Sequence, residues 1–147
     1  IGPPEVMSWV ARAKQAADLH TSIFAQFLLA NVVQQPGWLD AQKARIVPMY
    51  RDRCVALADA LEAALGDRIS FHRPDGGMFL WTRFTDIPDT TALLQHALRE
   101  GVAFVPGNAF TIDQVPDSKA RFSYSTLSPA QLGAAVQRLA RAVDAAS

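Results

Sequence analysis

The hydrophobic pattern of this chain changes its period once, near residue 66, and that change limits the possible folds more than any other feature. Before it, apolar residues recur at spacings of three and four, as they do on one face of a helix. After it, short apolar runs alternate with turns and shorter helical stretches. Two long helical regions followed by mixed short elements are typical of an α+β protein.

The first helical region begins at Pro3-Pro4 and ends at Gln35-Pro36-Gly37, with a polar interruption at residues 18–22. Proline suits the start of a helix because the N–H that it lacks has no partner in the first turn. The apolar face resumes after this interruption, so the whole stretch is predicted as one long helical region.

A second helix is predicted over residues 40–65, with Gly66 as its C-terminal stop. Pro48 lies inside it and cannot donate a hydrogen bond to the carbonyl of Ala44. We therefore expect a kink or a break at that position.

Short elements are predicted in the second half of the chain. Four apolar runs indicate strands at residues 68–72, 78–84, 102–105 and 120–125. A helix at residues 90–99, capped by Thr90 or Thr91 and closed by Gly101, separates the second strand from the third. Ser128 and Gln131 form a capping box that opens the last helix. The order predicts an α+β two-layer sandwich, a small and mostly antiparallel sheet with helices on one side.

Composition narrows the class of protein. The 147 residues are 50% hydrophobic and 19% charged, which excludes a disordered chain and suits a single domain over residues 1–147. The formal net charge of +0 gives no general attraction to nucleic acid or to an anionic membrane. A single cysteine excludes an internal disulfide. We predict a soluble, cytoplasmic protein, and the start at Ile1 without methionine predicts a part of a longer one.

The common catalytic motifs are missing from the sequence. His20, His72 and His96 lack the spacing of a metal site, and neither a phosphate-binding loop nor a nucleophile elbow is present. We predict no metal site. Cys54 lies on the apolar side of the second helix, which favours packing over nucleophilic chemistry.

Three segments have features that are unusual for residues with a purely structural role. Two glycines, Gly76 and Gly77, precede a strongly apolar strand; they permit close backbone approach, although an ordinary turn also explains them. The segment 105–110 runs from a strand end into a loop, where functional groups often lie. Arg121 interrupts an apolar strand. It therefore faces outward, forms a structural ion pair with an aspartate, or belongs to a ligand-binding site.

Taken in order, these segments resemble the C-terminal part of the class I/II aminotransferases, fold-type I enzymes that use pyridoxal 5′-phosphate (PLP). The subgroup most like this chain is that of the aminoadipate/kynurenine-type aminotransferases. The matching motifs are Gly76-Gly77-Met78-Phe79-Leu80-Trp81, Phe104-Val105-Pro106-Gly107-Asn108-Ala109-Phe110 and Arg121-Phe122-Ser123-Tyr124. The resemblance extends over the whole chain and implies the small domain of such an enzyme.

The resemblance also implies site residues. Arg121 matches the arginine that grips the substrate α-carboxylate, a role that suits the two parallel donors of a guanidinium. Phe79 and Phe110 match aromatic positions that line the substrate pocket. Asn108 matches the loop that carries the second of them.

The same resemblance places the cofactor site outside this chain. The cofactor-binding lysine, the aspartate beneath the pyridine ring and the phosphate loop would lie upstream, and Lys14, Lys43 and Lys119 do not match the lysine motif. We therefore expect no catalytic or PLP-binding residue here and an inactive fragment of a homodimeric enzyme that acts on an amino acid and a 2-oxo acid. The alternative is the effector-sensing domain of a MocR-type transcription regulator, in which this domain would itself contact no nucleic acid.

Overall fold

The computed structural model describes residues 1–146, and the chain divides into two compact units, Ile1–Ala44 and Arg45–Ser147. That residues 1–147 form one domain of a longer protein stays a prediction. Among the described residues, no helix is both long and apolar enough to cross a membrane.

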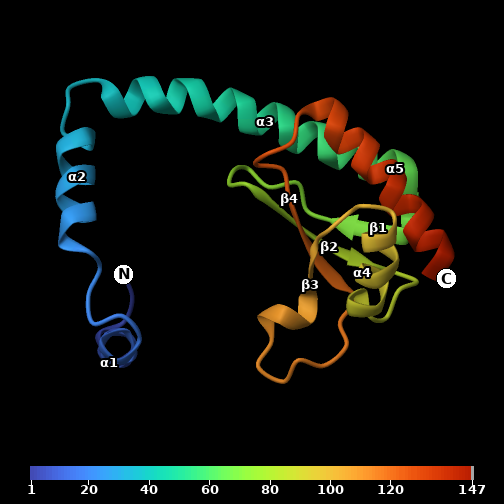
Figure 1. Ribbon diagram of the computed structural model, residues 1–147, viewed down its shortest axis with the longest axis horizontal. Helices are drawn as coiled ribbons and strands as arrows, with labels where there is room; N and C mark the ends of the chain where they lie inside the picture. The colour runs from blue at the N-terminus through green and yellow to red at the C-terminus, as the bar shows by residue number, and fades with distance from the viewer. Residues whose placement is uncertain (147) are drawn as a thin grey trace. The chain divides into compact units, whose positions relative to one another are not determined.

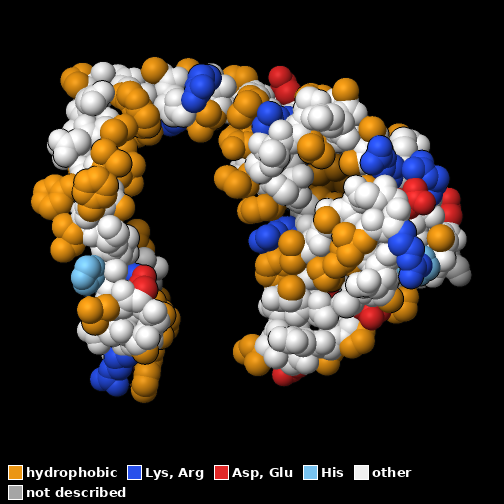
Figure 2. Space-filling view, viewed as in Figure 1, with side chains coloured by type: hydrophobic (Ala, Val, Ile, Leu, Met, Phe, Trp, Pro, Cys, Tyr) orange, Lys and Arg blue, Asp and Glu red, His pale blue; other side chains and the backbone are white. Residues whose placement is uncertain are grey.

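The first unit is helical (Figure 1). Helix α1 spans Pro4–Ala17 and helix α2 spans Ile23–Val33, so the single long helical region predicted here is divided into two helices at its polar interruption. The Ser22 hydroxyl caps α2 by accepting a hydrogen bond from the Ala25 N–H at 3.4 Å. Neither helix has a buried residue, although α2 is apolar on all sides, and hydrophobic side chains cover it in Figure 2.

Helix α3 spans Trp38–Leu65 and runs through Pro48 without interruption. Of the expected kink or break at Pro48, the break is therefore not present. Proline removes a single hydrogen bond, and the later turns of α3 are fixed by burial of Leu57, Ala58, Leu61 and Leu65 against the sheet. The helix stops where predicted, because Gly66 adopts a φ of 51° and leads into the 3-10 turn η1, Gly66–Arg68.

Four antiparallel strands form the sheet of the second unit, in the spatial order β1-β2-β4-β3 (Figure 1). Their bounds are β1 Ile69–Phe71, β2 Phe79–Phe84, β3 Val105–Pro106 and β4 Lys119–Ser123. The third strand is much shorter than predicted. Val102 and Phe104 are buried but lie outside the strand, so the apolar run there reflects burial rather than strand pairing.

The helices pack on one face of this sheet. Burial alternates along β2 and β4, with Leu80, Phe84 and Phe122 turned toward the core. Helices α3, α4 (Thr90–Arg99) and α5 (Pro129–Ala146) contribute to the same core. The predicted α+β sandwich, with a small antiparallel sheet and helices on one side, is confirmed.

The two predicted helix caps have different outcomes. At α5, the Ser128 N–H donates to the Gln131 side chain at 2.9 Å and the Gln131 N–H donates to Ser128 Oγ at 3.3 Å, so the capping box is confirmed. At α4, Asp89 is the cap: its carboxylate accepts from the Thr91 N–H at 2.8 Å. Neither threonine serves as the cap, because Asp89 precedes them and has a stronger acceptor.

Candidate functional site

Arg121 lies in the middle of the sheet, on the face that no helix of its unit covers. Its position on β4 is opposite Trp81 of β2 and Val105 of β3. Its neighbours along the strand, Ala120 and Phe122, are buried on the other face. Because side chains alternate along a strand, Arg121 shares the uncovered face with Phe79 and Trp81.

Two phenyl rings enclose the Arg121 guanidinium. Its central carbon lies 4.1 Å from the centre of the Phe79 ring and 4.8 Å from the centre of the Phe110 ring. Trp81 meets Phe110 edge to face, with ring centres 5.2 Å apart. A cation over an aromatic face gains about 0.5–2 kcal/mol, so these rings hold the guanidinium in place. We call Arg121, Phe79 and Phe110 the arginine sandwich.

The Nε of Arg121 is buried and has no hydrogen-bond partner among the described residues. Within residues 1–146, Arg121 also takes part in none of the ion pairs, so the structural ion pair that its sequence context left open is not formed. An unpaired donor on a charged group costs free energy that a bound acceptor returns. A planar carboxylate fits this donor set, because a guanidinium presents parallel N–H bonds.

The loops before β2 and after β3 supply the two rings. Gly77 adopts a φ of 93°, which bends the chain just before Phe79 enters β2. Phe110 ends the 3-10 turn η2, Gly107–Phe110, that follows β3 directly. The sheet register and the turn η2 together bring residues 79, 110 and 121 close to one another; that they bind a substrate stays a prediction.

Asn108 lies in the same turn as Phe110. Its carbonyl oxygen accepts hydrogen bonds from the Thr111 N–H at 3.1 Å and the Thr111 hydroxyl at 3.0 Å, which close the turn. This places Asn108 in the structure that carries Phe110. A contact of its side chain with substrate stays a prediction.

A shallow hollow of about 560 Å³ extends the uncovered face from Phe79 and Trp81 toward β1. Phe71 and His72 form its far side. It lies next to the Phe79 ring of the arginine sandwich. Among the described residues, no group of three or more histidine, cysteine or acidic side chains gathers to hold a metal.

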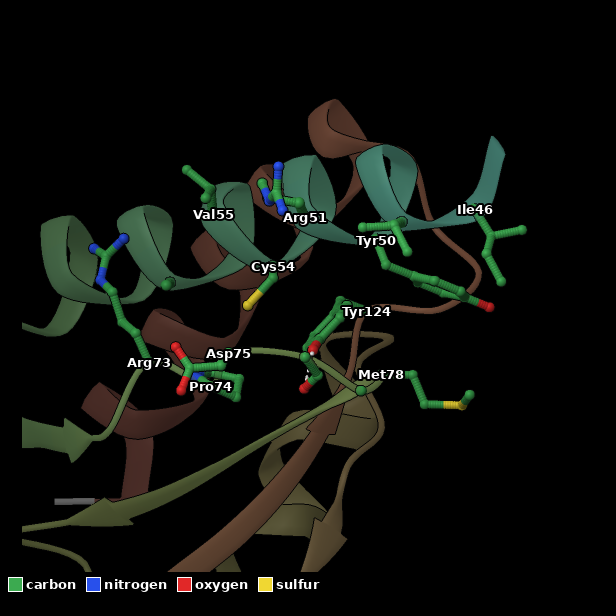
Figure 3. Close-up of a pocket in the computed structure, with 14 residues that line it drawn as sticks. Ile46, Tyr50, Arg51, Cys54, Val55, Arg73, Pro74, Asp75, Met78 and Tyr124 are labelled. Carbon is green, nitrogen blue, oxygen red and sulfur yellow. Dashed lines mark hydrogen bonds between the residues drawn. The ribbon is translucent and has the colours of Figure 1, made fainter. Parts of the chain in front are cut away.

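A second pocket, of about 600 Å³, lies between α3 and the turn that leads into β2, and Arg121 is not among its lining residues. Tyr50 and Cys54 reach into it from α3, and Tyr124 lies across from them (Figure 3). Burial, followed by contact with Cys54, raises the pKa of the Tyr124 hydroxyl to about 12. Cys54 packs against the core as predicted, but sequence reasoning missed this pocket, because nothing local pairs residue 54 with residue 124.

The family model for aminotransferase class I and II matches residues 1–139, and the chain belongs to that family.

Individual relatives agree. The chain is 33% identical to a 2-aminoadipate transaminase of Thermus thermophilus over 97% of its own length and 36% of that protein. It is 31% identical to the mitochondrial kynurenine/α-aminoadipate aminotransferase of Mus musculus, over 97% of this chain and 34% of that one. The chain thus spans about a third of the length of these curated relatives.

A solved structure has the same fold. The α-aminoadipate aminotransferase LysN of Thermus thermophilus, in complex with N-(5′-phosphopyridoxyl)-L-leucine, superposes with a TM-score of 0.79 at 32% identity, over 99% of this chain and 37% of that chain. One relative is of another kind, an uncharacterized HTH-type transcriptional regulator of Bacillus subtilis, YhdI, with 24% identity over 95% of this chain and 29% of that protein.

The cofactor that the family implies does not fit the lysines of this chain. Lys14 pairs with Asp18 at 2.8 Å, Lys43 with Asp40 at 2.7 Å, and Lys119 with Asp117 at 3.4 Å. Each amine therefore has a carboxylate partner.

Proposed function

We propose that this chain is the C-terminal portion of a PLP-dependent aminotransferase and that Arg121 binds the α-carboxylate of its substrate. The observation that supports this best is the arginine sandwich, a half-buried guanidinium between two phenyl rings whose Nε has no partner among the described residues. The family match and the aminotransferase relatives support the reaction class. The substrates would be an α-amino acid and a 2-oxo acid.

The contribution of this chain would be positioning. A carboxylate on Arg121 would be held by two parallel charge-assisted hydrogen bonds, which fixes its rotation as well as its place. Phe79 and Phe110 would exclude water from those bonds and strengthen them. PLP, bound by the rest of the protein, would supply the electron sink. Holding the substrate in one orientation lowers the entropic cost of reaction.

The rest of the proposal concerns the full-length protein. We infer a homodimer in the cytoplasm, with PLP held by the part of the protein that corresponds to the other two thirds of the relatives. The apolar helix α2, with none of its residues buried within its own unit, supports a contact with a further domain or subunit.

Replacing Arg121 by lysine in the full-length enzyme tests the proposal. Lysine keeps the charge but loses the paired donors, and a charge-assisted hydrogen bond contributes about 1.5–3 kcal/mol. We expect kcat/KM for amino acids to fall about 10- to 100-fold. Amines that lack the carboxylate should show little change. Steady-state kinetics on both substrate types measure the two effects.

A matched control is Arg99→Lys, because Arg99 is exposed at the last position of α4, a helix that packs on the covered face of the sheet. It should leave both rates unchanged. If Arg121→Lys lowers the rates for carboxylated and decarboxylated substrates equally, Arg121 is a structural residue and the proposed site is wrong.

A second candidate function is an effector-sensing domain of a MocR-type regulator, which the similarity to the Bacillus subtilis regulator favours. In that case the same sandwich would bind an amino acid as a signal. DNA binding by the full-length protein, measured with and without amino acid, separates the two functions. Amino transfer without DNA binding supports the enzyme.

A further inference from the structure

We propose that Thr90 is a positioning residue that holds Phe110 over the Arg121 guanidinium. The inference rests on the proposed function, because it assigns Thr90 to the carboxylate site rather than to general stability. Thr90 and Thr82 are the two buried polar residues of the described chain, and Thr90 is 0% exposed.

Three segments meet at the Thr90 side chain. Its hydroxyl lies 2.6 Å from the Lys119 carbonyl oxygen and 2.9 Å from that of Asp117, and it accepts a hydrogen bond from the Gly107 N–H at 3.4 Å. The Thr90 N–H donates to the Asp117 carbonyl at 2.9 Å. One residue thus joins the start of α4 to the start of β4 and the start of η2.

The contact between the last two segments is close. A Cβ atom added to Gly107 would lie 2.8 Å from Asp117 Oδ2 and 2.9 Å from the Lys119 carbonyl oxygen. Nothing larger than glycine fits there without a shift of the backbone. The turn η2 is therefore seated directly on the beginning of β4.

This junction controls both sides of the arginine sandwich. Phe110 follows Gly107 by three residues within η2, and Arg121 follows Lys119 by two residues within β4. A change of a few tenths of an ångström at the junction would move the ring relative to the guanidinium. Loss of the Thr90 hydroxyl would also leave the buried Gly107 N–H without this acceptor, so η2 would tend to lift from the strand.

Thr82 provides a matched comparison. It is 1% exposed, and its hydroxyl donates to the Ala120 carbonyl of β4 at 3.1 Å. It lies on β2, where it pairs with Ala120 of β4, but within residues 1–146 it makes no hydrogen bond to η2. Thr82 and Thr90 therefore share burial and a bond to β4 and differ in the link to Phe110.

The test measures binding of an unreactive acid to the full-length protein. The probe is 3-phenylpropionate, which offers a carboxylate, and its neutral amide serves as the reference ligand. For Thr90→Val we expect the Kd of the acid to rise about 3- to 10-fold. This factor corresponds to the loss of one hydrogen bond of about 0.7–1.4 kcal/mol. The Kd of the amide should stay nearly constant. Thr90→Ser keeps the hydroxyl and should restore acid binding. Titration calorimetry gives both constants.

Thr82→Val should lower thermal stability about as much as Thr90→Val does. It should leave the ratio of the Kd of the acid to the Kd of the amide unchanged. If Thr90→Val does not fold, Gly107→Ala takes its place, because its Cβ displaces η2 without removing the threonine. Its control is Gly133→Ala on α5, where an added Cβ meets nothing within 4 Å. Gly107→Ala should weaken the acid selectively and Gly133→Ala should not.

The inference is overturned if Thr90→Val, or Gly107→Ala in its place, weakens the acid and the amide alike, or changes only thermal stability. Arg121→Lys in the same titration distinguishes this failure from failure of the proposed function. If Arg121→Lys selectively weakens the acid and the Thr90 and Gly107 variants do not, the carboxylate site stands and the positioning role falls. If Arg121→Lys also weakens the acid and the amide alike, the carboxylate site and the positioning role of Thr90 are both wrong.

Discussion

The two faces of the four-stranded sheet are made by the same strands but have opposite surroundings. On the covered face, Leu80 and Phe84 are each 1% exposed beneath the helices. On the other face, Phe79 and Trp81 are 41% and 43% exposed. Neighbouring residues of β2 therefore serve different purposes. The covered residues stabilise the sheet, whereas the uncovered residues are those to which we attribute ligand binding, so stability and the proposed binding can be changed separately.

A similar contrast explains the behaviour of arginine on this sheet. A guanidinium on the covered face would be costly, since no acceptor is available among the packed side chains. On the uncovered face, Arg121 is stabilised by two aromatic rings and keeps an unpaired donor for a ligand. The uncovered face is thus the side on which a half-buried guanidinium can keep a donor that no protein group occupies.

The largest expected effect tests the covered face. Phe84→Ala should destabilise the sheet by about 3–5 kcal/mol, because it removes a fully buried ring and leaves a cavity. Trp81→Ala, three positions earlier on the uncovered face, should cost about 1 kcal/mol or less. Amide hydrogen exchange in β4 of the full-length protein measures both. Equal losses would remove the distinction between the faces.

Much of this division could be predicted from the sequence. The strands near residues 78–84 and 120–125, the stop at Gly66 and the Ser128 capping box are local features, and they appear as predicted. The wrong predictions depend on distant contacts. Packing against the sheet carries α3 through Pro48, and residues 102–104 are buried without forming a strand.

The site could be predicted only in part. Resemblance assigned Arg121, Phe79 and Phe110, but their approach depends on the register that sets Trp81 opposite Arg121, which no local pattern encodes. Thr90 was an incorrect cap prediction, because its hydroxyl instead bonds residues near 117 in the chain. Such contacts are set by the tertiary structure.

A smaller effect tests the helices that cover the sheet. Ser128→Ala removes an acceptor from the capping box of α5 and should cost about 1 kcal/mol. Gln137→Ala, at an exposed position in the middle of the same helix, should cost nothing measurable, since alanine is the better helix former. Hydrogen exchange in the first turns of α5 compares the two. An equal loss of stability with Gln137→Ala would show that the capping box is not what stabilises the N-terminal end of α5.

The smallest effect at neutral pH, and the most specific, concerns Tyr124 at the covered end of β4. The residue is 1% exposed, and burial, then Cys54, raises its pKa from 10.0 to about 12. Unfolding would let the hydroxyl ionise at its ordinary pKa, so the unfolded chain binds fewer protons between about pH 10 and pH 12. The stability that Tyr124 contributes is then complete below about pH 10 and is lost as the pH rises toward 12. Tyr124→Phe cannot ionise and loses only a long hydrogen bond to the Gly76 carbonyl at 3.5 Å, so its thermal midpoint should lie slightly below that of the wild type near pH 8 and fall less steeply above pH 10. Parallel curves for the two proteins across that range would mean that water reaches Tyr124, and that the covered face is less dry than its packing indicates.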